Sequence, residues 1–399
     1  MSPTTTTQKL SGYEFYNKAL GNPKFIVAPM VDQSEHAWRV LCRRHGAQVC
    51  FTPMFHARLF SEPGHGEKYR AEQWSSDKDD RPLIVQFCAN DPDILLRAAK
   101  LVENDCDAVD LNLGCPQHIA KRGHYGSYLQ DEWELIEKMV STLHRELAIP
   151  VTVKIRVFPT VEKTVEYAKM IERAGAQMLT VHGRLREQKG HHTGLADWDK
   201  IKAVKEALKI PVVANGNILY YEDVQRCIDY TGVDGVMSAE GNLHNPAIFE
   251  KRDMPPFTWE MAQEYLEICR DVCPNTKGGA IKGHLFKIFR PSLSIHTDLR
   301  SKLGQAKSWQ EYWDVTMELK KRLEEERERV GEEEFMGQAD EKGIRKYAHW
   351  RCQPAIRPPV EATKGTEAKN GKREAEKQAD GNEANKKIKT EEPEAATTA

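Results

Sequence analysis

The sequence contains nine cysteines, but no two of them stand at the CxxC spacing of zinc ribbons and redox motifs. They are scattered singly along 399 residues and form no regular framework. This pattern argues against a small disulfide-stapled secreted domain, and it offers no cysteine set for a structural zinc ion. We therefore predict free thiols, a reducing compartment and no bound metal.

The chain also lacks long apolar runs and a large excess of one charge. No apolar stretch approaches the roughly 18 to 20 residues that span a bilayer, so we expect no membrane association. Residues 1–10 are rich in threonine and show no basic segment followed by an apolar one, so we expect no secretory signal. With 58 basic and 60 acidic residues, the chain is not a polycation.

No Gly-x-Gly-x-x-Gly sequence follows the first predicted strand, which disfavours a doubly wound dinucleotide-binding sheet. Short β-branched segments instead alternate with amphipathic helical patterns. The predicted strands are Phe25–Ala28, Ala47–Phe51, Leu83–Phe87, Ala108–Leu113, Val151–Ile155, Met178–Val181, Val212–Ala214 and Gly235–Met237. The helices between them include Pro92–Glu103, Glu132–Leu147, Val161–Ala174, Trp198–Leu208 and Tyr221–Tyr230. This alternation predicts an α/β fold, a closed (β/α)8 TIM barrel, with the open doubly wound sheet as the alternative.

The pattern changes after Phe257, where strand signals end and helical signals continue. We predict a polar N-terminal segment at residues 1–22, a barrel at 23–256, a C-terminal helical domain at 257–350 and a disordered tail at 351–399. From Pro354 onward the tail has no aromatic residue and few large aliphatic ones. Such a segment buries too little apolar surface to offset the entropy lost on ordering.

Two basic clusters lie within the tail. Lys372-Arg373 and Lys386-Lys387-Ile388-Lys389 are 12 residues apart, which is the spacing of a bipartite nuclear-import signal. We therefore expect the protein in both the cytoplasm and the nucleus, and we expect it to be a monomer.

The most specific motif is the run Asp110-Leu111-Asn112-Leu113-Gly114-Cys115-Pro116-Gln117. An apolar strand leads directly into a Gly-Cys-Pro turn. In a parallel barrel, functional groups lie on the loops that follow the strands. The turn would therefore hold the Cys115 thiol at the barrel mouth, beside the Asn112 amide.

Distinctive sequences also follow other predicted strands. They are Ala28-Pro29-Met30-Val31, Gln86, Lys154-Ile155-Arg156, His182-Gly183-Arg184, Asn215-Gly216-Asn217 and Ser238-Ala239-Glu240-Gly241. Each has an ordinary structural explanation: a lysine that snorkels, a core histidine or a turn. Their joint occurrence at one end of one barrel favours a shared binding site.

The Cys115 run and the strand-end sequences resemble, in order, those of the tRNA dihydrouridine synthase family across about residues 23–250. The run Thr52–Phe60 is similar to the eukaryotic branch that acts on uridines 16 and 17 of the D-loop. The resemblance implies reduction of tRNA uridines to 5,6-dihydrouridine, with FMN as cofactor and NAD(P)H as reductant. It implies Cys115 as the catalytic acid. The FMN-binding residues expected are Ala28, Pro29, Met30, Val31, Gln86, Lys154, His182, Asn215, Gly216, Asn217, Ala239 and Glu240.

Two positions depart from the pattern of many bacterial members of that family. This chain has Asn215-Gly216-Asn217 in place of Asn-Gly-Asp, and Ala239-Glu240 in place of Gly-Arg. A Glu240 carboxylate beside a phosphate would repel it. We therefore expect main-chain N–H groups and His182 to hold the phosphate, with the Glu240 side chain turned away.

The residue types suit this chemistry. Gly-rich loops after the last two strands supply N–H donors for a phosphate. Gln86 can bond the polar edge of a flavin, and the Lys154 cation would stabilise negative charge on reduced FMN. A thiol with a pKa of about 8.5 is mostly protonated at pH 7 and can protonate C5 of uracil. Asn112 and Arg156 are candidate contacts to the uracil carbonyl groups.

The segment Lys277–Lys307 carries seven lysines and arginines against one acidic residue, Asp298. We predict that Lys282, Lys287 and Arg290 bind the phosphates of tRNA, although a solvated helical face is the alternative. Lys121–Gly126, just after Cys115, is predicted to be a mobile loop.

Two other functions stay open at this point. A flavin-dependent reductase of free pyrimidines would share the barrel and the cysteine, but it would not need a basic helical domain. A tRNA-binding protein without catalysis would not need Cys115, Lys154 and His182 together.

Overall fold

The computed structural model describes residues 9–331 and 345–355; the tail beyond Ala355, with its basic clusters, lies outside these ranges. Eight parallel strands close into a barrel, because β1 pairs with both β2 and β9, and β2 pairs with β4. A short strand, β3, pairs with the C-terminal end of β4, beyond the residues of β4 that pair with β2. The bounds are β1 (Phe25–Val27), β2 (Val49–Phe51), β3 (Phe55–His56), β4 (Leu83–Cys88), β5 (Ala108–Leu113), β6 (Val151–Arg156), β7 (Met178–His182), β8 (Val212–Asn215) and β9 (Gly235–Ser238).

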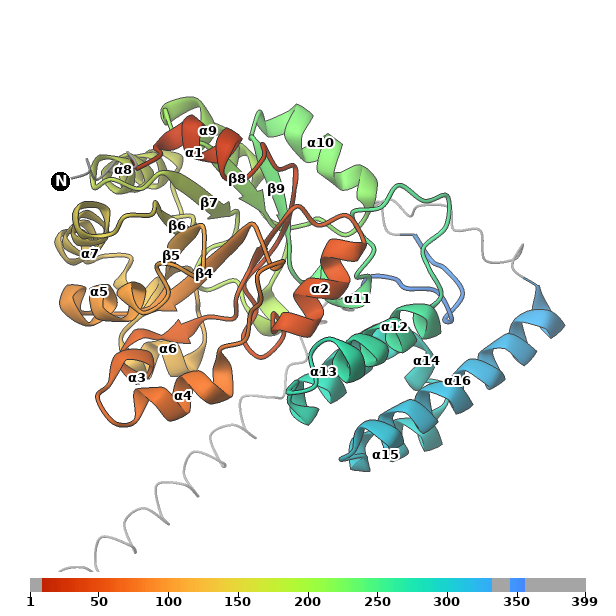
Figure 1. Ribbon diagram of the computed structural model, residues 1–399. Helices are drawn as coiled ribbons and strands as arrows, with labels where there is room; N and C mark the ends of the chain where they lie inside the picture. The colour runs from red at the N-terminus through yellow and green to blue at the C-terminus, as the bar shows by residue number, and fades with distance from the viewer. Residues whose placement is uncertain (1–8, 332–344, 356–399) are drawn as a thin grey trace, which may run out of the picture. The chain divides into compact units, whose positions relative to one another are not determined.

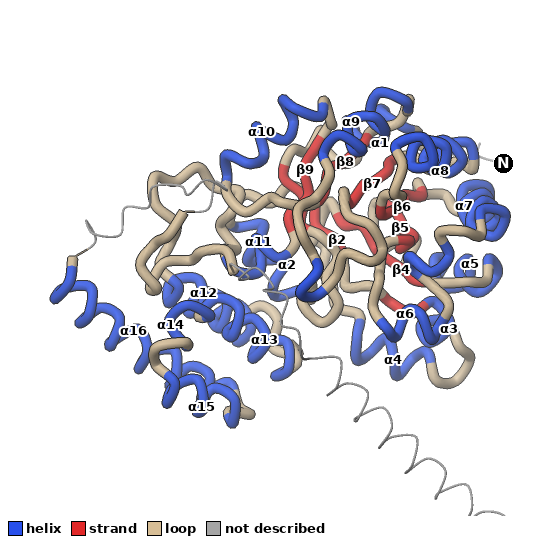
Figure 2. Tube along the Cα trace, turned by 180° about the vertical axis from the view of Figure 1, so that it is seen from behind, coloured by secondary structure: helices blue, strands red, loops and turns tan. Residues whose placement is uncertain are grey.

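Helices surround this barrel, so the predicted TIM-barrel fold is confirmed (Figures 1 and 2). They are α2 (His36–Arg44), α3 (Ala57–Ser61), α4 (Gly66–Gln73), α5 (Pro92–Lys100), α6 (His118–Gly123), α7 (Trp133–Glu146), α8 (Val161–Arg173), α9 (Trp198–Ala207), α10 (Tyr221–Thr231) and α11 (Glu240–His244), with single 3-10 turns at Gly126–Leu129 and Gly190–His192. Helix α5 begins where the sequence favours it: Asp91 accepts hydrogen bonds from two N–H groups of the first turn, and Pro92 follows. The segment Lys121–Gly126, predicted as a loop, forms the end of α6 and the turn after it.

The barrel interior has an apolar floor and a polar upper part. Inward side chains alternate with outward ones along each strand. The floor cluster is Ile26, Val49, Phe51, Ile84, Ala108, Met178, Val213 and Met237. Helix α1 (Gly12–Lys18) closes this end with Phe15 and Tyr16, both fully buried. Residues 1–22 were predicted to be a polar segment without a helix, so α1 is an addition to the prediction.

Five further helices follow the barrel: α12 (Thr258–Asp271), α13 (Gly278–Ile288), α14 (Arg290–Leu293), α15 (Thr297–Gln305) and α16 (Trp309–Val330). They join the barrel at α2, where Trp38 stacks on His284 with ring centroids 3.8 Å apart. The Glu35 carboxylate accepts a hydrogen bond from Tyr265 Oη at 2.6 Å and lies 2.9 Å from His284 Nε2. We call these four residues the α2 joint. No helix within residues 9–331 or 345–355 combines the length and apolar character that crossing a bilayer requires.

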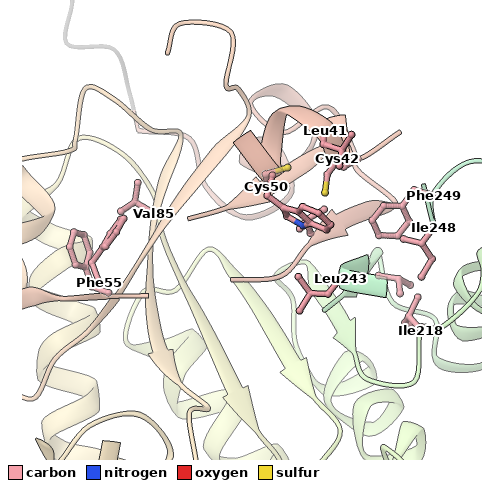
Figure 3. Packing of buried hydrophobic residues seen from close by; sticks show 14 of the residues in the cluster. Leu41, Cys42, Cys50, Phe55, Val85, Ile218, Leu243, Ile248 and Phe249 are labelled. Atoms are coloured by element: carbon pink, nitrogen blue, oxygen red, sulfur yellow. The ribbon is translucent and has the colours of Figure 1, made fainter. Parts of the chain in front are cut away.

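Beside the joint, apolar residues of the barrel wall fill the space under α2 and α11 (Figure 3). Cys42 and Cys50 lie close together there, and the labelled Phe249, Ile248 and Leu243 approach from the other side. Burial raises the pKa of both thiols, so they behave as small apolar groups.

A C-terminal strap, residues 345–355, crosses back over the helices. Arg351 pairs with Phe257 in an antiparallel bridge, and Trp350 and Cys352 are buried. Arg345 N donates to Tyr220 Oη at the start of α10 at 2.9 Å. The predicted disordered tail began at residue 351, but residues 351–355 are packed, because Cys352 supplies apolar surface next to Trp350.

A buried ion pair holds α2 to the segment before β4. Asp80 accepts hydrogen bonds from Arg39 Nε and Nη2 at 2.9 and 2.6 Å and from Arg43 at 3.2 Å. The Arg39 and Asp80 side chains are 1% and 0% exposed. Burial alone would raise the pKa of Asp80, but the two arginines override it and lower the pKa.

We expect Asp80→Ala to lower the free energy of unfolding by about 3–5 kcal/mol, because it leaves Arg39 buried without its partner. A depressed native pKa contributes stability above the unfolded pKa of about 4, and that contribution disappears as pH falls. The variant should therefore lose less stability than the parent between pH 5 and pH 3. Urea titrations measure both effects, and Asp79→Ala, which removes a 78% exposed carboxylate, is the control. Equal unfolding energies for the two variants would contradict this assignment.

Candidate active site

The Cys115 turn follows β5 at the barrel mouth and is held by the Asn112 side chain. Asn112 Oδ1 accepts hydrogen bonds from Gly114 N at 3.1 Å and from Cys115 N at 2.9 Å. On the other side, Ser127 donates its N–H and its hydroxyl to the Cys115 carbonyl oxygen at 3.1 and 2.9 Å. Gly126 has φ +67°, and a Cβ there would lie 2.8 Å from the same oxygen. The turn therefore requires glycine at 126.

A buried hydrogen-bond relay runs from the barrel interior to this turn. Thr152 Oγ1 donates to Asp110 Oδ1 at 2.6 Å, and Gln86 Nε2 donates to Asp110 Oδ2 at 2.8 Å. Asn112 Nδ2 then donates to Gln86 Oε1 at 2.8 Å, and Asn112 Oδ1 accepts from the N–H of Cys115. An ionised carboxylate only accepts hydrogen bonds, so Asp110 fixes the orientation of both amides. Burial raises the pKa of Asp110 to about 6.

Strand register places Asn112 beside Lys154, and Arg156 beside His182. Lys154 Nζ donates to Asn215 Oδ1 at 2.9 Å, within the interior. Burial, and then the nearby Arg156, lower the pKa of Lys154 to about 7. The site therefore contains a lysine whose charge is not matched by a hydrogen-bonded carboxylate.

Arg156 spans two loops. Its Nε donates to the Gly114 carbonyl at 2.8 Å, and Nη1 donates to the carbonyls of Leu185 and Gln188 at 2.8 and 3.1 Å. Nη2 makes no hydrogen bond to the residues that the structure describes. The guanidinium thus supports the Cys115 turn and keeps one N–H edge for another acceptor.

A second polar group gathers at the ends of β7 and β8. Arg184 Nη1 lies 3.0 Å from His182 Nε2, and Arg184 Nη2 donates to Asn217 Oδ1 at 2.7 Å. Burial, and then Lys154 and the arginines, lower the pKa of His182 well below its usual value, so the ring is neutral at pH 7. Gly216 has φ +116°, and a Cβ there would lie 2.6 Å from Ala196, so only glycine fits.

The structure brings most of the predicted site residues to one end of the barrel. Gln86, Asn112, Lys154, Arg156, His182 and Asn215 line the interior, and Cys115 is half-buried above them. The loop after β1 carries Ala28, Pro29, Met30 and Val31; the Val31 side chain is 55% exposed. Ala239 and Glu240 begin the five-residue helix α11 after β9.

Some neighbours were not predicted. Asp110, Ser127 and Arg184 bond to predicted site residues, and Thr152 bonds to Asp110. None of the four was predicted as a site residue, although Arg184 belongs to the strand-end sequence His182-Gly183-Arg184. The signal for Asp110 was its period-two spacing from Asn112, which turns both side chains inward. Arg184 follows His182 by two residues at the end of β7, so the same spacing applied.

Lys282, Lys287 and Arg290 lie on α13 and α14, outside the barrel. Arg290 is exposed, whereas Lys282 Nζ donates to the Gly304 carbonyl at 2.7 Å. The surface around Lys282, Lys287 and Arg290 carries less net positive charge than the sequence of residues 277–307 predicts, because an acidic residue of another helix lies within it. Helix α16 supplies Glu318, which lies 3.0 Å from Lys302.

Burial raises the pKa of the Cys115 thiol, and nearby Arg156, Lys154 and Lys189 only partly oppose this. The thiol is therefore protonated at neutral pH and is an acid rather than a nucleophilic thiolate.

Comparisons with known proteins agree with this geometry. The dihydrouridine synthase (Dus) family model matches residues 26–335. A mouse protein named tRNA-dihydrouridine(16/17) synthase (NAD(P)(+))-like is 52% identical over 374 residues, with 93% of this chain and 76% of that protein covered. The enzymes named tRNA-dihydrouridine(16/17) synthase of Schizosaccharomyces pombe and Saccharomyces cerevisiae are 52% and 50% identical, with 88% of this chain and 92% and 87% of theirs covered. The half-buried Cys115 thiol above a polar barrel interior thus occurs in a chain that is 50–52% identical to these relatives over 88–93% of its length. The chain belongs to the dihydrouridine synthase family of tRNA-modifying oxidoreductases.

Proposed function

We propose that this protein reduces the C5–C6 bond of uridines 16 and 17 in the tRNA D-loop to give dihydrouridine, with FMN as the bound flavin and NAD(P)H as the reductant. The observation that carries the proposal is the Cys115 turn, held by the Asn112 side chain at the end of β5, where Asn112 pairs in register with the buried Lys154 of β6. The choice of uridines 16 and 17 is supported by the names of relatives that are 50–52% identical.

The interior fits a flavin. The Lys154 ammonium group is buried beside the neutral Asn215 amide, and Thr180 Oγ1 on β7 is buried without a hydrogen-bond partner among the described residues. An anionic, polar ring would match both groups. A cationic group suited to a phosphate lies at the ends of β7 and β8. It consists of Arg184, Asn217 and the main chain at Gly216, where no side chain covers the backbone. In this proposal Arg184 supplies the positive charge beside the phosphate, and Glu240 does not contact it.

A bound flavin would supply the hydride that uracil C6 receives. The protein must then deliver one proton to C5. The Cys115 Sγ–H is the candidate donor, because burial keeps it protonated and the Asn112 and Ser127 bonds fix its position. The free Nη2 edge of Arg156 is suited to a uracil carbonyl. The Asn112 amide is already committed to Gln86 and the Cys115 turn, so its expected contact with uracil would have to share those bonds.

We propose that the exposed face of α13 and α14 binds the tRNA backbone through Lys282, Lys287 and Arg290. A salt dependence of tRNA affinity that survives charge reversal at these three positions would contradict this. The basic clusters Lys372–Lys389 are proposed to direct part of the population to the nucleus, which imaging of the full chain tests. The protein is also proposed to act as a monomer, which sedimentation of the full chain tests.

A reductase of free pyrimidines is the competing function. It would use the same thiol and the same interior. Turnover of free uracil or orotate at rates equal to those with tRNA would favour it.

We expect Cys115→Ala to lower dihydrouridine formation by at least about 100-fold, the contribution typical of a general acid, and to leave the flavin bound. The flavin is expected to contact the interior rather than this turn, so the visible spectrum should not change. Mapping dihydrouridine in tRNA from a strain that lacks the enzyme, complemented with each variant, provides the measurement. Cys227→Ala, which removes a buried thiol from α10, serves as the control. Loss of flavin together with activity would instead make Cys115 structural.

We expect Asp110→Leu to disorganise the relay. Leucine accepts no hydrogen bond, so Gln86 Nε2 and Thr152 Oγ1 lose their acceptor, and Gln86 no longer fixes the Asn112 amide that holds the Cys115 N–H. The turnover number should fall about 10-fold or more, since one unsatisfied buried group costs about 1–3 kcal/mol, and Cys115 should be alkylated faster. Asp105→Leu, an exposed change on the preceding loop, is the control.

Asp110→Asn is the conservative variant, because its oxygen can accept from Gln86 Nε2 while its N–H group donates to the Thr152 hydroxyl. It should keep the alkylation rate close to that of the parent. An alkylation rate unchanged in Asp110→Leu would show that the relay does not hold the Cys115 turn.

We expect the pH dependence of flavin retention to report on Lys154. Its pKa is lowered to about 7 in the protein, and an anionic ligand would raise it. Ligand binding then takes up a proton, so retention should weaken as pH rises above about 7. In Lys154→Met, retention should be about 10-fold weaker at pH 6.5 and nearly independent of pH, whereas exposed Lys209→Met should behave like the parent. Dialysis followed by flavin fluorescence measures this; a Lys154→Met profile that follows the parent's would refute the role.

A further inference from the structure

Three side chains able to ligate a metal converge in the helical domain, far along the chain from the barrel mouth. His296 precedes α15, Glu326 lies near the end of α16, and His349 lies on the strap. One ligand atom from each lies within 4.8 Å of those of the other two. We propose that these residues bind a single divalent transition-metal ion, with Zn²⁺ as the best match.

The carboxylate of Glu326 lies between the two imidazoles, so the three side chains face a common position. Glu326 Oε1 lies 3.2 Å from His349 Nε2, and Glu326 Oε2 lies 3.8 Å from His296 Nε2. The second distance is too long for a hydrogen bond. His296 Nε2 is buried and has no hydrogen-bond partner among the residues that the structure describes. Such an orphaned polar atom costs about 1–3 kcal/mol, and a metal ion would remove that cost.

The ligand chemistry selects the ion. Zinc binds imidazole nitrogen at about 2.0–2.1 Å and carboxylate oxygen at about 2.0–2.2 Å, which in a tetrahedron places ligand atoms about 3.4 Å apart. The most distant ligand atoms, up to 4.8 Å apart, therefore need to close by up to about 1.4 Å on binding the ion. Magnesium and calcium prefer all-oxygen sites, so two imidazoles disfavour them.

The electrostatic surroundings suit a cation. Glu326 lies beside both imidazoles and supplies the negative charge that a cation requires. The guanidinium group of Arg322 is paired with Asp298 at 2.9 Å and with Glu318 at 2.5 Å, which offsets its charge. Each of the three ligand side chains is 15–26% exposed, so an ion and one water molecule have access.

The proposed ion would fasten the strap. His349 O accepts from Ser292 Oγ at 2.6 Å, and Trp350 O accepts from Thr258 N at 2.9 Å. A metal ion would add a further attachment, to His296 before α15 and to Glu326 of α16 at once. Because Arg345 N also donates to Tyr220 Oη, the strap links these helices to α10 of the barrel. The ion is therefore a structural clamp and is independent of the proposed reaction.

Metal binding by the full chain tests the proposal directly. The protein is stripped with a chelator and titrated with Co²⁺, whose visible bands report nitrogen ligands, and then with Zn²⁺ in competition. We expect one ion per chain and a higher melting temperature with Zn²⁺. His349→Ala should weaken binding by more than the roughly 10- to 100-fold loss caused by removing an outer-shell partner.

The exposed His65→Ala removes an imidazole elsewhere and should bind the ion as the parent does. Glu326→Gln keeps the shape of its side chain, so it tests the site even where His349→Ala fails to fold. An absence of saturable binding in the parent would overturn the proposal. Equal affinity in the parent and in Glu326→Gln would also overturn it, since the ion would then lie elsewhere.

Discussion

The alternation of side chains along eight strands of a closed barrel is the constraint on which the site depends. All inward side chains share one small interior. Apolar side chains fill the end that α1 closes, and polar side chains fill the opposite end. The apolar floor excludes water from below, while most of the buried apolar residues lie in the larger cluster outside it. The polar layer is consequently desolvated, and desolvation determines how Asp110, Lys154 and His182 titrate.

Burial moves two opposite charges toward neutrality in that layer. Asp110 has a raised pKa and Lys154 a lowered one, although they attract each other, because no hydrogen bond joins them and the loss of hydration dominates. Their side chains instead end on neutral amides, Gln86 and Asn215. A polar ligand in the interior would therefore stabilise the charged form of Lys154. Separately, the hydrogen-bond relay couples the orientation of Asp110 to that of the turn that carries Cys115.

The strands were predictable because β-branched residues at period two are a strong local signal, and each predicted strand lies within two residues of the observed one. The Cys115 turn and the strand-end residues were predictable because a parallel barrel collects them at one end. Phe15 and Tyr16 of α1 were missed because two aromatic residues in a polar stretch carry no periodicity. Glu318 was missed as a neighbour of Lys302, since 16 residues separate them. The expectation of no metal came from cysteine spacing, which says nothing about His296 and His349, 53 positions apart in the chain.

The α2 joint has a mechanical consequence. Glu35 and Trp38 lie a few residues after Met30, and the same short segment both borders the barrel mouth and holds Tyr265 and His284. Rotating the helices against the barrel would separate a stacked pair and a largely buried carboxylate from its partners. The distance from Cys115 to the exposed face of α13 is therefore fixed. An RNA that contacted both places would have to change its own shape, by unstacking and extruding a nucleotide, because the two parts of the protein do not move relative to each other.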